Sequence, residues 1–202
     1  MAGSLCTVLR MRARPTPTPV ADDVSSWRPT TKRGKAETVA IFAVFALYAA
    51  FLLKLLFLSR APGSERSVNL VPFASIANYS SSHARGAGRI AFANVVGNIL
   101  IFIPLGVYAS WLRNRASAWV TMLTVASVSV AVEIIQGVFG VGASDIDDVI
   151  LNSVGGLIGI LTFMLLSAIL RERSRVRSAL AVLSLLTMPV WCFFLFIIRL
   201  HM

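Results

Sequence analysis

Long apolar runs alternate with short polar segments along this chain of 202 residues. Five of the runs are long enough to cross about 30 Å of hydrocarbon as helices that rise about 1.5 Å per residue. They are Thr38–Leu58, Ile90–Leu112, Ala116–Val141, Val149–Leu170 and Ser178–Ile198. Lys54 is the only charged residue in the first run and Glu133 the only one in the third, while the other three contain none. The pattern predicts five transmembrane helices.

The composition agrees with this pattern, because 56% of the residues are hydrophobic, only 14% are charged and the mean hydropathy is +0.77. These values exclude an ordinary soluble domain. We therefore expect an all-α fold, a polytopic membrane helix bundle with about five transmembrane helices. The net charge of +10 is explained by membrane orientation and anionic lipid, so nucleic acid is not expected as a partner.

The chain divides into three parts by composition. Residues 1–37 are basic and proline-rich, with too few apolar residues to bury a core, and are predicted to form a disordered cytoplasmic tail. Residues 38–170 hold the first four predicted spans and form the membrane domain. Residues 171–202 begin with the basic connection "RERSRVR" and end with the fifth span.

The basic residues predict the orientation of the bundle. They concentrate in the tail, after the second span and after the fourth span, and with five spans these segments lie on one side, which should be cytoplasmic. The connections Ser59–Arg89 and Gly142–Asp148 would then face outward. The arginines of the first of these connections, Arg60, Arg66, Arg85 and Arg89, oppose this orientation, but the cytoplasmic segments contain more basic residues.

Polar side chains inside three of the spans share one depth. At about 1.5 Å per residue, Asn94 and Asn98 lie about 6 and 12 Å below the outer end of the second span. Glu133 and Gln136 lie about 12 and 8 Å below that of the third span, and Asn152 about 5 Å below that of the fourth. A charge at this depth is costly and is typical of a functional site.

Helical spacing places these residues on shared faces. Asn94 and Asn98 are four residues apart, Glu133 and Gln136 are three apart, and Asp145, Asp148 and Asn152 share a face if the fourth helix begins near Asp145. The same face continues with small residues, Gly155, Gly156 and Gly159, which allow a neighbouring backbone to approach closely. We predict that the second, third and fourth spans pack together around this polar cluster.

The residues leave other roles open. The amides and glycines could serve packing alone, and Asp145 and Asp148 could cap the fourth helix. Asp147 points off the shared face, so we expect it to be solvated, and Asn69 fits either turn chemistry or the polar cluster. A divalent ion held by Glu133, Asp145 and Asp148 is a further alternative. Our assignment contains no metal, no cofactor and no catalytic residue.

Four ordered motifs resemble the VanZ-like family of small bacterial membrane proteins. They are "NLVPF" at 69–73, "NVVGNILIFIPLG" at 94–106, "EIIQ" at 133–136 and "DIDDVILNSVGGLIG" at 145–159. The resemblance implies a bacterial inner membrane protein with an envelope-related role, since the family is named for a protein associated with teicoplanin resistance. Family members often carry a basic residue shortly before the first aspartate, whereas this chain reads "GVGAS" at 140–144. Lys54, Arg85 or Arg89 could replace it.

Three functions are consistent with the sequence. The first is a non-enzymatic envelope protein whose outward-facing site binds a membrane lipid, a cell-wall precursor or an antibiotic, and its predicted ligand-binding residues are Asn69, Asn94, Asn98, Glu133, Gln136, Asp145, Asp148 and Asn152. The second is a small ion-coupled transporter that uses Glu133, although no inverted repeat is evident. The third is an enzyme for lipid-linked substrates, although His83 and His201 are the only histidines and no phosphate-binding glycine loop is present.

The predicted orientation can be tested by cysteine labelling in intact cells. In a background without cysteines, a cysteine placed at Ser144 should react with a membrane-impermeant maleimide because it faces outward. A cysteine at Ser174 should be protected. The reverse labelling would overturn the orientation.

Overall fold

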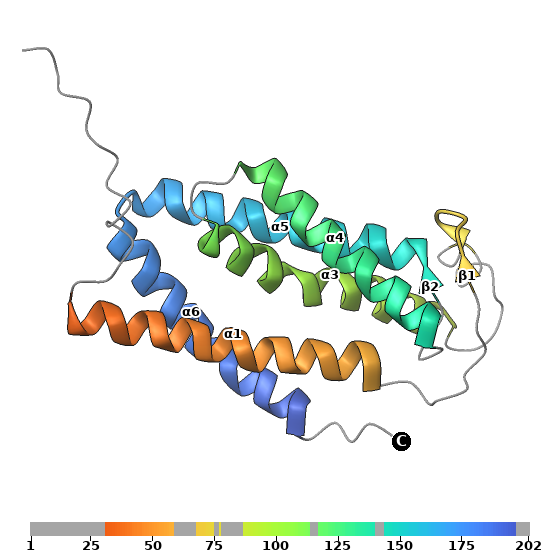
Figure 1. Ribbon diagram of the computed structural model, residues 1–202, viewed down its shortest axis with the longest axis horizontal. Coiled ribbons are helices and arrows are strands. Elements are labelled where there is room, and N and C mark those ends of the chain that lie inside the picture. Colours follow the sequence, from red (N-terminus) through yellow and green to blue (C-terminus); the bar gives the residue numbers. More distant parts are fainter. Residues whose placement is uncertain are drawn as a thin grey trace, which may run out of the picture.

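The computed structural model describes residues 31–58, 68–74, 77, 87–113, 117–139 and 144–196. The long helices in these ranges are α1 (Lys32–Leu58), α3 (Ala87–Leu112), α4 (Ala118–Phe139), α5 (Ile146–Leu170) and α6 (Arg173–Phe196). Two short strands, β1 (Val68–Asn69) and β2 (Ser144–Asp145), pair in parallel. Each of the five helices is long and apolar enough to cross a membrane, so the predicted helical membrane bundle is confirmed (Figure 1).

Four helices begin earlier than the apolar runs that predict them. The starts are Lys32 for α1, Ala87 for α3, Ile146 for α5 and Arg173 for α6, because a helix can continue beyond the hydrocarbon that its apolar run crosses. Residues 32–37 of the predicted tail therefore form the first turns of α1, and the Thr31 hydroxyl caps that helix by accepting a hydrogen bond from the Gly34 amide at 3.1 Å. Residues 1–30 lie outside the described residues.

The two ends of the bundle, seen in Figure 1, differ in the charge that prevails among their described residues. Helices α1, α4 and α6 begin where α3 and α5 finish, and we call this the basic end, with Lys32, Arg33, Lys35, Arg113, Arg171, Arg173, Arg175 and Arg177. The opposite end, where α5 begins and α4 finishes, is the acidic end, with Glu133, Asp145, Asp147 and Asp148. The described residues of the three basic segments lie together at the basic end, as predicted.

Helices α3 and α5 make the closest contact in the bundle. A Cβ atom added to Gly155 would lie 2.2 Å from the Ile99 carbonyl oxygen, and one added to Gly159 would lie 2.1 Å from the Ile103 carbonyl oxygen. Because both contacts advance by four residues on each helix, α3 and α5 run in the same direction. Their backbones touch with no room for a side chain between them, as the small-residue face predicts.

Helix α4 packs antiparallel to α5. A Cβ on Gly156 would lie 2.3 Å from Cγ1 of Val125, and one turn nearer the acidic end the Asn152 amide donates to the Ser129 hydroxyl at 3.0 Å. Each step of four residues forward on α5 is thus a step of four residues back on α4. The predicted packing of the second, third and fourth spans is confirmed.

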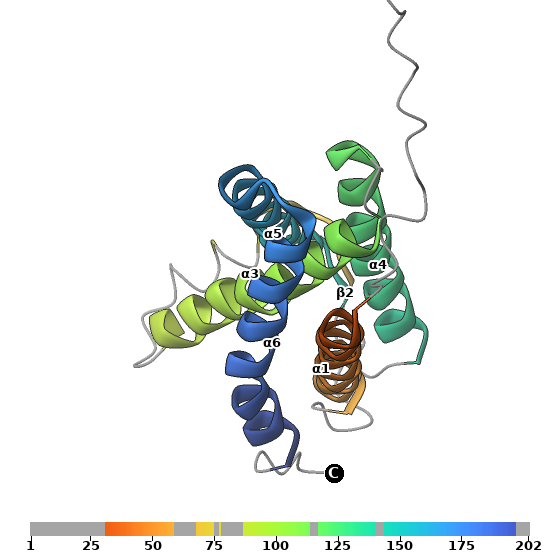
Figure 2. The same ribbon diagram turned by 90° about the vertical axis from the view of Figure 1, so that its left-hand side faces the viewer.

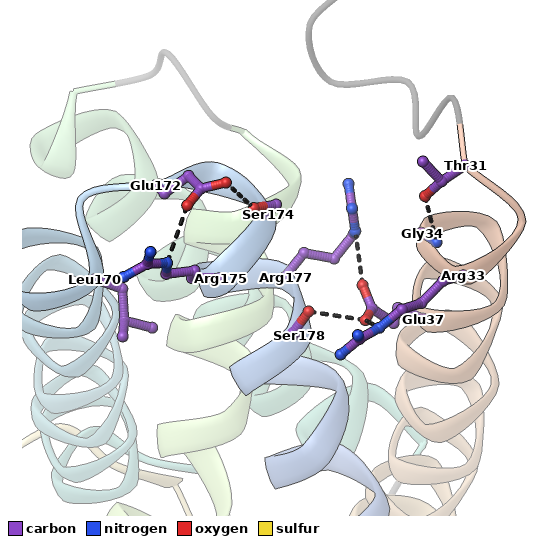
Figure 3. Close-up of a pocket in the computed structure, with 10 residues that line it drawn as sticks. All are labelled: Thr31, Arg33, Gly34, Glu37, Leu170, Glu172, Ser174, Arg175, Arg177 and Ser178. Carbon is purple, nitrogen blue, oxygen red and sulfur yellow. Dashed lines mark hydrogen bonds and ion pairs between the residues drawn. The ribbon is translucent and has the colours of Figure 1, made fainter.

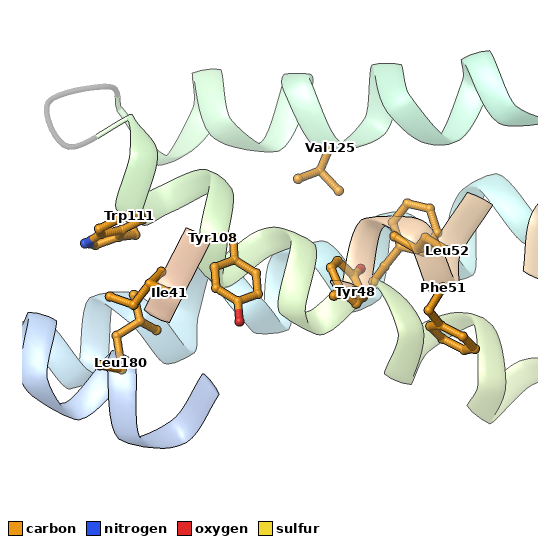
Figure 4. Packing of buried hydrophobic residues seen from close by; sticks show 10 residues of the cluster. Ile41, Tyr48, Phe51, Leu52, Tyr108, Trp111, Val125 and Leu180 are labelled. Atoms are coloured by element: carbon orange, nitrogen blue, oxygen red, sulfur yellow. The ribbon is translucent and has the colours of Figure 1, made fainter. Parts of the chain in front are cut away.

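Helices α1 and α6 form a second layer against α3. Figure 2 looks along α1 and shows α1 and α6 below α4 and α5. Their contact is rich in aromatic rings: Tyr48 of α1 meets Trp191 of α6 edge-on with ring centroids 5.2 Å apart. The Tyr48 hydroxyl also donates to the Ile101 carbonyl of α3 at 2.6 Å, so the buried aromatic cluster joins both layers (Figure 4).

The close contact of α3 and α5 predicts that Gly155→Leu and Gly159→Leu strongly destabilise the bundle. Each substitution inserts a branched side chain against a backbone carbonyl, and overpacking of this kind costs about 1–3 kcal/mol or more. Thermal unfolding in detergent measures the effect.

Gly97→Ala is the matched control, because a Cβ at Gly97 has nothing within 4 Å and alanine favours the middle of a helix. We expect this variant to unfold at the wild-type temperature or above it. If the leucine variants kept wild-type stability, the glycine face would have to point towards lipid and the helix arrangement would be wrong.

Candidate functional site

A cavity of about 220 Å³ opens at the acidic end, where α3, α4 and α5 meet the end of α1. Six of its lining residues are polar, and all six were predicted from their depth and spacing. They are Asn94, Asn98, Glu133, Gln136, Asp148 and Asn152. Leu55, Ala93, Gly97 and Ile101 supply the apolar part of the wall. Three helices therefore bring their polar faces into one chamber.

Asp148 connects α5 to α3 inside this chamber. Its Oδ1 accepts hydrogen bonds from the side-chain amides of Asn98 at 2.5 Å and Asn94 at 3.4 Å. The two asparagines lie one turn apart on α3, so both amides converge on the same carboxylate. Asp148 is only 9% exposed. The two amides stabilise its carboxylate where lipid offers no hydrogen-bond donors.

Glu133 connects α4 to the start of α5. Its Oε2 accepts a hydrogen bond from the Asp145 backbone amide at 2.9 Å, and its side chain is 5% exposed. Asp145 in turn is the N-cap of α5, since its Oδ1 accepts from the Asp147 amide at 2.9 Å. The predicted start of the fourth helix near Asp145 is confirmed, and so is the capping role of this residue.

The segment 68–74 lies against the start of α5. The parallel pairing places Asn69 opposite Asp145, and the Asn69 amide donates to Asp145 Oδ1 at 3.2 Å. Asn69 also accepts from the Val71 amide at 3.1 Å, which is an Asx-type turn. Both roles considered for Asn69 are therefore present, a turn contact and a contact with the acidic residues.

Asp147 is a correction to the sequence-based interpretation, which expected a solvated side chain. It is only 2% exposed, and Oδ1 accepts a hydrogen bond from the Phe73 backbone amide. The face that α5 turns away from the cavity is covered by segment 68–74, and Phe73 adopts a positive φ of 65° there. The spacing of residues within α5 could not predict that segment 68–74 covers this face.

Ser129 is a polar residue beside the site that the sequence interpretation missed. It is fully buried, it accepts the amide hydrogen bond of Asn152, and it lies four residues before Glu133 on the same face of α4. Its spacing from Glu133 was the feature of the sequence that could have identified Ser129.

The Oδ1 atom of Asn152 is buried without a hydrogen-bond partner, while the residue itself lines the cavity. A buried carbonyl oxygen that accepts no hydrogen bond from the protein normally accepts one from water or a ligand.

The charged side chains among the described residues that line the cavity are acidic. The cavity is lined by two carboxylates and four amides, and no lysine or arginine among the described residues lines it. Lys54, proposed as a replacement for the missing basic residue, donates to the Leu195 carbonyl of α6, Arg89 lies exposed at the start of α3, and Arg85 lies outside the described residues. Within the described part of the chain, no group of three or more His, Cys, Asp or Glu side chains has an arrangement suited to a metal ion.

The eight predicted site residues therefore form one connected set. Six line the cavity, and Asn69 and Asp145 lie beside it, joined to it through the Asp145 amide and Glu133. Chemically, the arrangement can accept hydrogen bonds from hydroxyl or ammonium groups and can donate amide hydrogen bonds in return. Ligand binding by these residues stays a prediction.

Comparisons with known proteins agree with the motifs in this region. The sequence model of the VanZ/LLP1 family matches residues 45–170, which include α3, α4, α5 and the cavity. The chain is 34% identical over 96 residues to Protein VanZ of Enterococcus faecium, an alignment that covers 48% of this chain and 52% of that protein. The match thus spans about half the length of this relative. No solved structure matches the chain significantly.

Because the family match extends over more than half of the chain and includes every residue of the cavity, the protein belongs to the VanZ/LLP1 family.

Proposed function

We propose that the cavity at the acidic end is a non-enzymatic recognition site for a polar group of a cell-envelope molecule. The observation that carries this proposal is the convergence of two buried carboxylates and four amides on one open chamber, with an unpaired Asn152 oxygen in its wall. If these side chains served packing alone, we would expect them to bond to one another with no cavity between them, because protein interiors are close-packed. Membership of the VanZ/LLP1 family supports a role in the envelope.

The charge of the cavity defines the class of ligand. Glu133 and Asp148 repel a phosphate and attract an amine or the hydroxyls of a sugar. At about 220 Å³ the cavity is smaller than the roughly 300–1,000 Å³ of pockets for drug-sized ligands. It therefore accommodates one sugar or amine of a lipid headgroup, a cell-wall precursor or a glycopeptide such as teicoplanin, with the remainder of that molecule outside.

The proposed orientation places the acidic end at the outer surface of the bacterial inner membrane. The larger number of basic residues at the basic end supports this orientation, because basic residues favour the cytoplasmic side. An outward-facing cavity would be accessible to envelope precursors after their export and to antibiotics that act outside the cell. The ligand would enter from the outer lipid headgroups and reach polar groups that lie about 5–12 Å below the outer ends of the spans.

The site is tested by Glu133→Gln and Asp148→Asn, which remove charge at nearly constant shape. We expect each variant to lose about tenfold in affinity for a purified cell-wall precursor lipid or for teicoplanin, because a hydrogen bond to a charged group is lost. The measurements are binding to the purified protein and teicoplanin susceptibility of a sensitive bacterium at matched membrane levels.

A carboxylate outside the cavity serves as the control. Asp147→Asn changes a buried carboxylate that accepts the hydrogen bond of the Phe73 amide. This variant should bind the same ligands with wild-type affinity. The proposal would be wrong if Asp147→Asn lost as much affinity as Glu133→Gln, or if neither cavity variant lost affinity. The carboxylates would then have a packing role only.

A further inference from the structure

A second and larger cavity lies at the basic end, between the beginnings of α1 and α6. Its volume is about 560 Å³, within the range of about 300–1,000 Å³ that is usual for ligand pockets. The residues that carry charge in its wall are Arg33 and Glu37 of α1, Glu172 before α6, and Arg175 and Arg177 of α6. It is separate from the candidate site at the acidic end and shares no residue with it.

Two glutamates fix the orientation of the three arginines. Glu37 receives the Nε–H of Arg33 at 3.0 Å through one oxygen and that of Arg177 at 3.1 Å through the other, and the Ser178 hydroxyl donates to it at 2.8 Å. Across the cavity, the Nε of Arg175 lies 2.9 Å from a carboxylate oxygen of Glu172. In every one of these ion pairs the contact is made through Nε.

This use of Nε leaves the terminal nitrogens of the guanidinium groups for another anion. In Figure 3 the terminal nitrogens of Arg177 point away from Glu37, while those of Arg33 extend from α1 towards α6. Guanidinium groups bind phosphate through two parallel N–H donors, so a guanidinium already held at Nε is preorganised for such contacts. The lining has three arginines against two glutamates and is net positive.

The backbone adds to this positive field. The first turns of α1 and α6 both line the cavity, with Thr31, Arg33 and Gly34 from one helix start and Ser174 and Arg175 from the other. Helix N-termini carry partial positive charge, and two of them beside one space favour an anion there. Leu170, the last residue of α5, provides an apolar wall beside the charged groups.

We propose that this cavity binds a phosphate group, either in the headgroup of an anionic lipid or as free phosphate. The oriented guanidiniums would contact the phosphate oxygens, while the two glutamates hold the arginines in place. The location at the ends of membrane-spanning helices puts the cavity at headgroup level, and the Leu170 side gives the apolar part of a lipid a surface to follow.

The probe is a fluorescent short-chain phosphatidylglycerol, titrated into the full chain in neutral detergent, with phosphatidylcholine as the zwitterionic reference. We expect phosphatidylglycerol to bind more tightly than phosphatidylcholine, and Arg33→Gln or Arg175→Gln to weaken its binding about tenfold. These two side chains are 83% and 70% exposed, so both variants should unfold at the wild-type temperature. Inorganic phosphate as a competitor separates the two sources: displacement at low millimolar concentration identifies free phosphate, and no displacement identifies the lipid.

Two further variants distinguish a built site from general attraction to a basic surface. Arg113→Gln removes a positive charge at the same end, but Arg113 donates to Thr124 at 2.6 Å and does not line the cavity. Arg175→Lys keeps the charge and removes the planar fork. The proposal expects the first to bind within twofold of wild type and the second to bind about fivefold more weakly. It is overturned if Arg113→Gln loses as much as Arg33→Gln, if Arg175→Lys binds like the wild type, or if neither phosphatidylglycerol nor phosphate binds.

Discussion

The close backbone contact between α3 and α5 sets the arrangement of the other helices and of the polar cavity. Gly155 and Gly159 allow the carbonyls of Ile99 and Ile103 to touch α5 directly. At that separation the side chains of Asn94 and Asn98 reach Asp148, whereas a layer of larger side chains would hold the helices apart. In a membrane, where apolar side chains gain little by leaving lipid, close packing and hydrogen bonds between helices supply the association energy. The glycines thus make the polar chamber geometrically feasible.

Charge is distributed so that each end of the bundle has its own chemistry. At the acidic end, carboxylates are buried against amide donors and around a small cavity. At the basic end, Glu37 and Glu172 pair with arginines through Nε and leave the other guanidinium nitrogens directed elsewhere. The same residue type therefore has opposite roles: Glu133 is a hydrogen-bond acceptor at a helix junction, and Glu37 orients cations and joins α1 to α6.

The layer of α1 and α6 closes the bundle without taking part in the glycine contact. Tyr48 bridges to α3 through the Ile101 carbonyl, and Lys54 and Glu37 bind α6 near the two ends of α1. Leu55 of α1 also contributes to the wall of the cavity at the acidic end. The second layer therefore holds α3 through Tyr48 and completes the chamber through Leu55, so a ligand there would contact parts of the chain far apart in sequence.

Sequence patterns alone predict the helices, their faces and most of the residues that line the candidate cavity. Apolar run length set the spans, helical spacing put Asn94 with Asn98 and Glu133 with Gln136, and common depth predicted their convergence, because all these relations are local to one helix or follow from the thickness of a bilayer. The tertiary structure decided what covers each face. The burial of Asp147 under Phe73, the pairing of Asn69 with Asp145, the contact of Ser129 with Asn152 and the joining of Glu37 to Arg177 depend on the path of segments up to 140 residues away, which local periodicity does not encode.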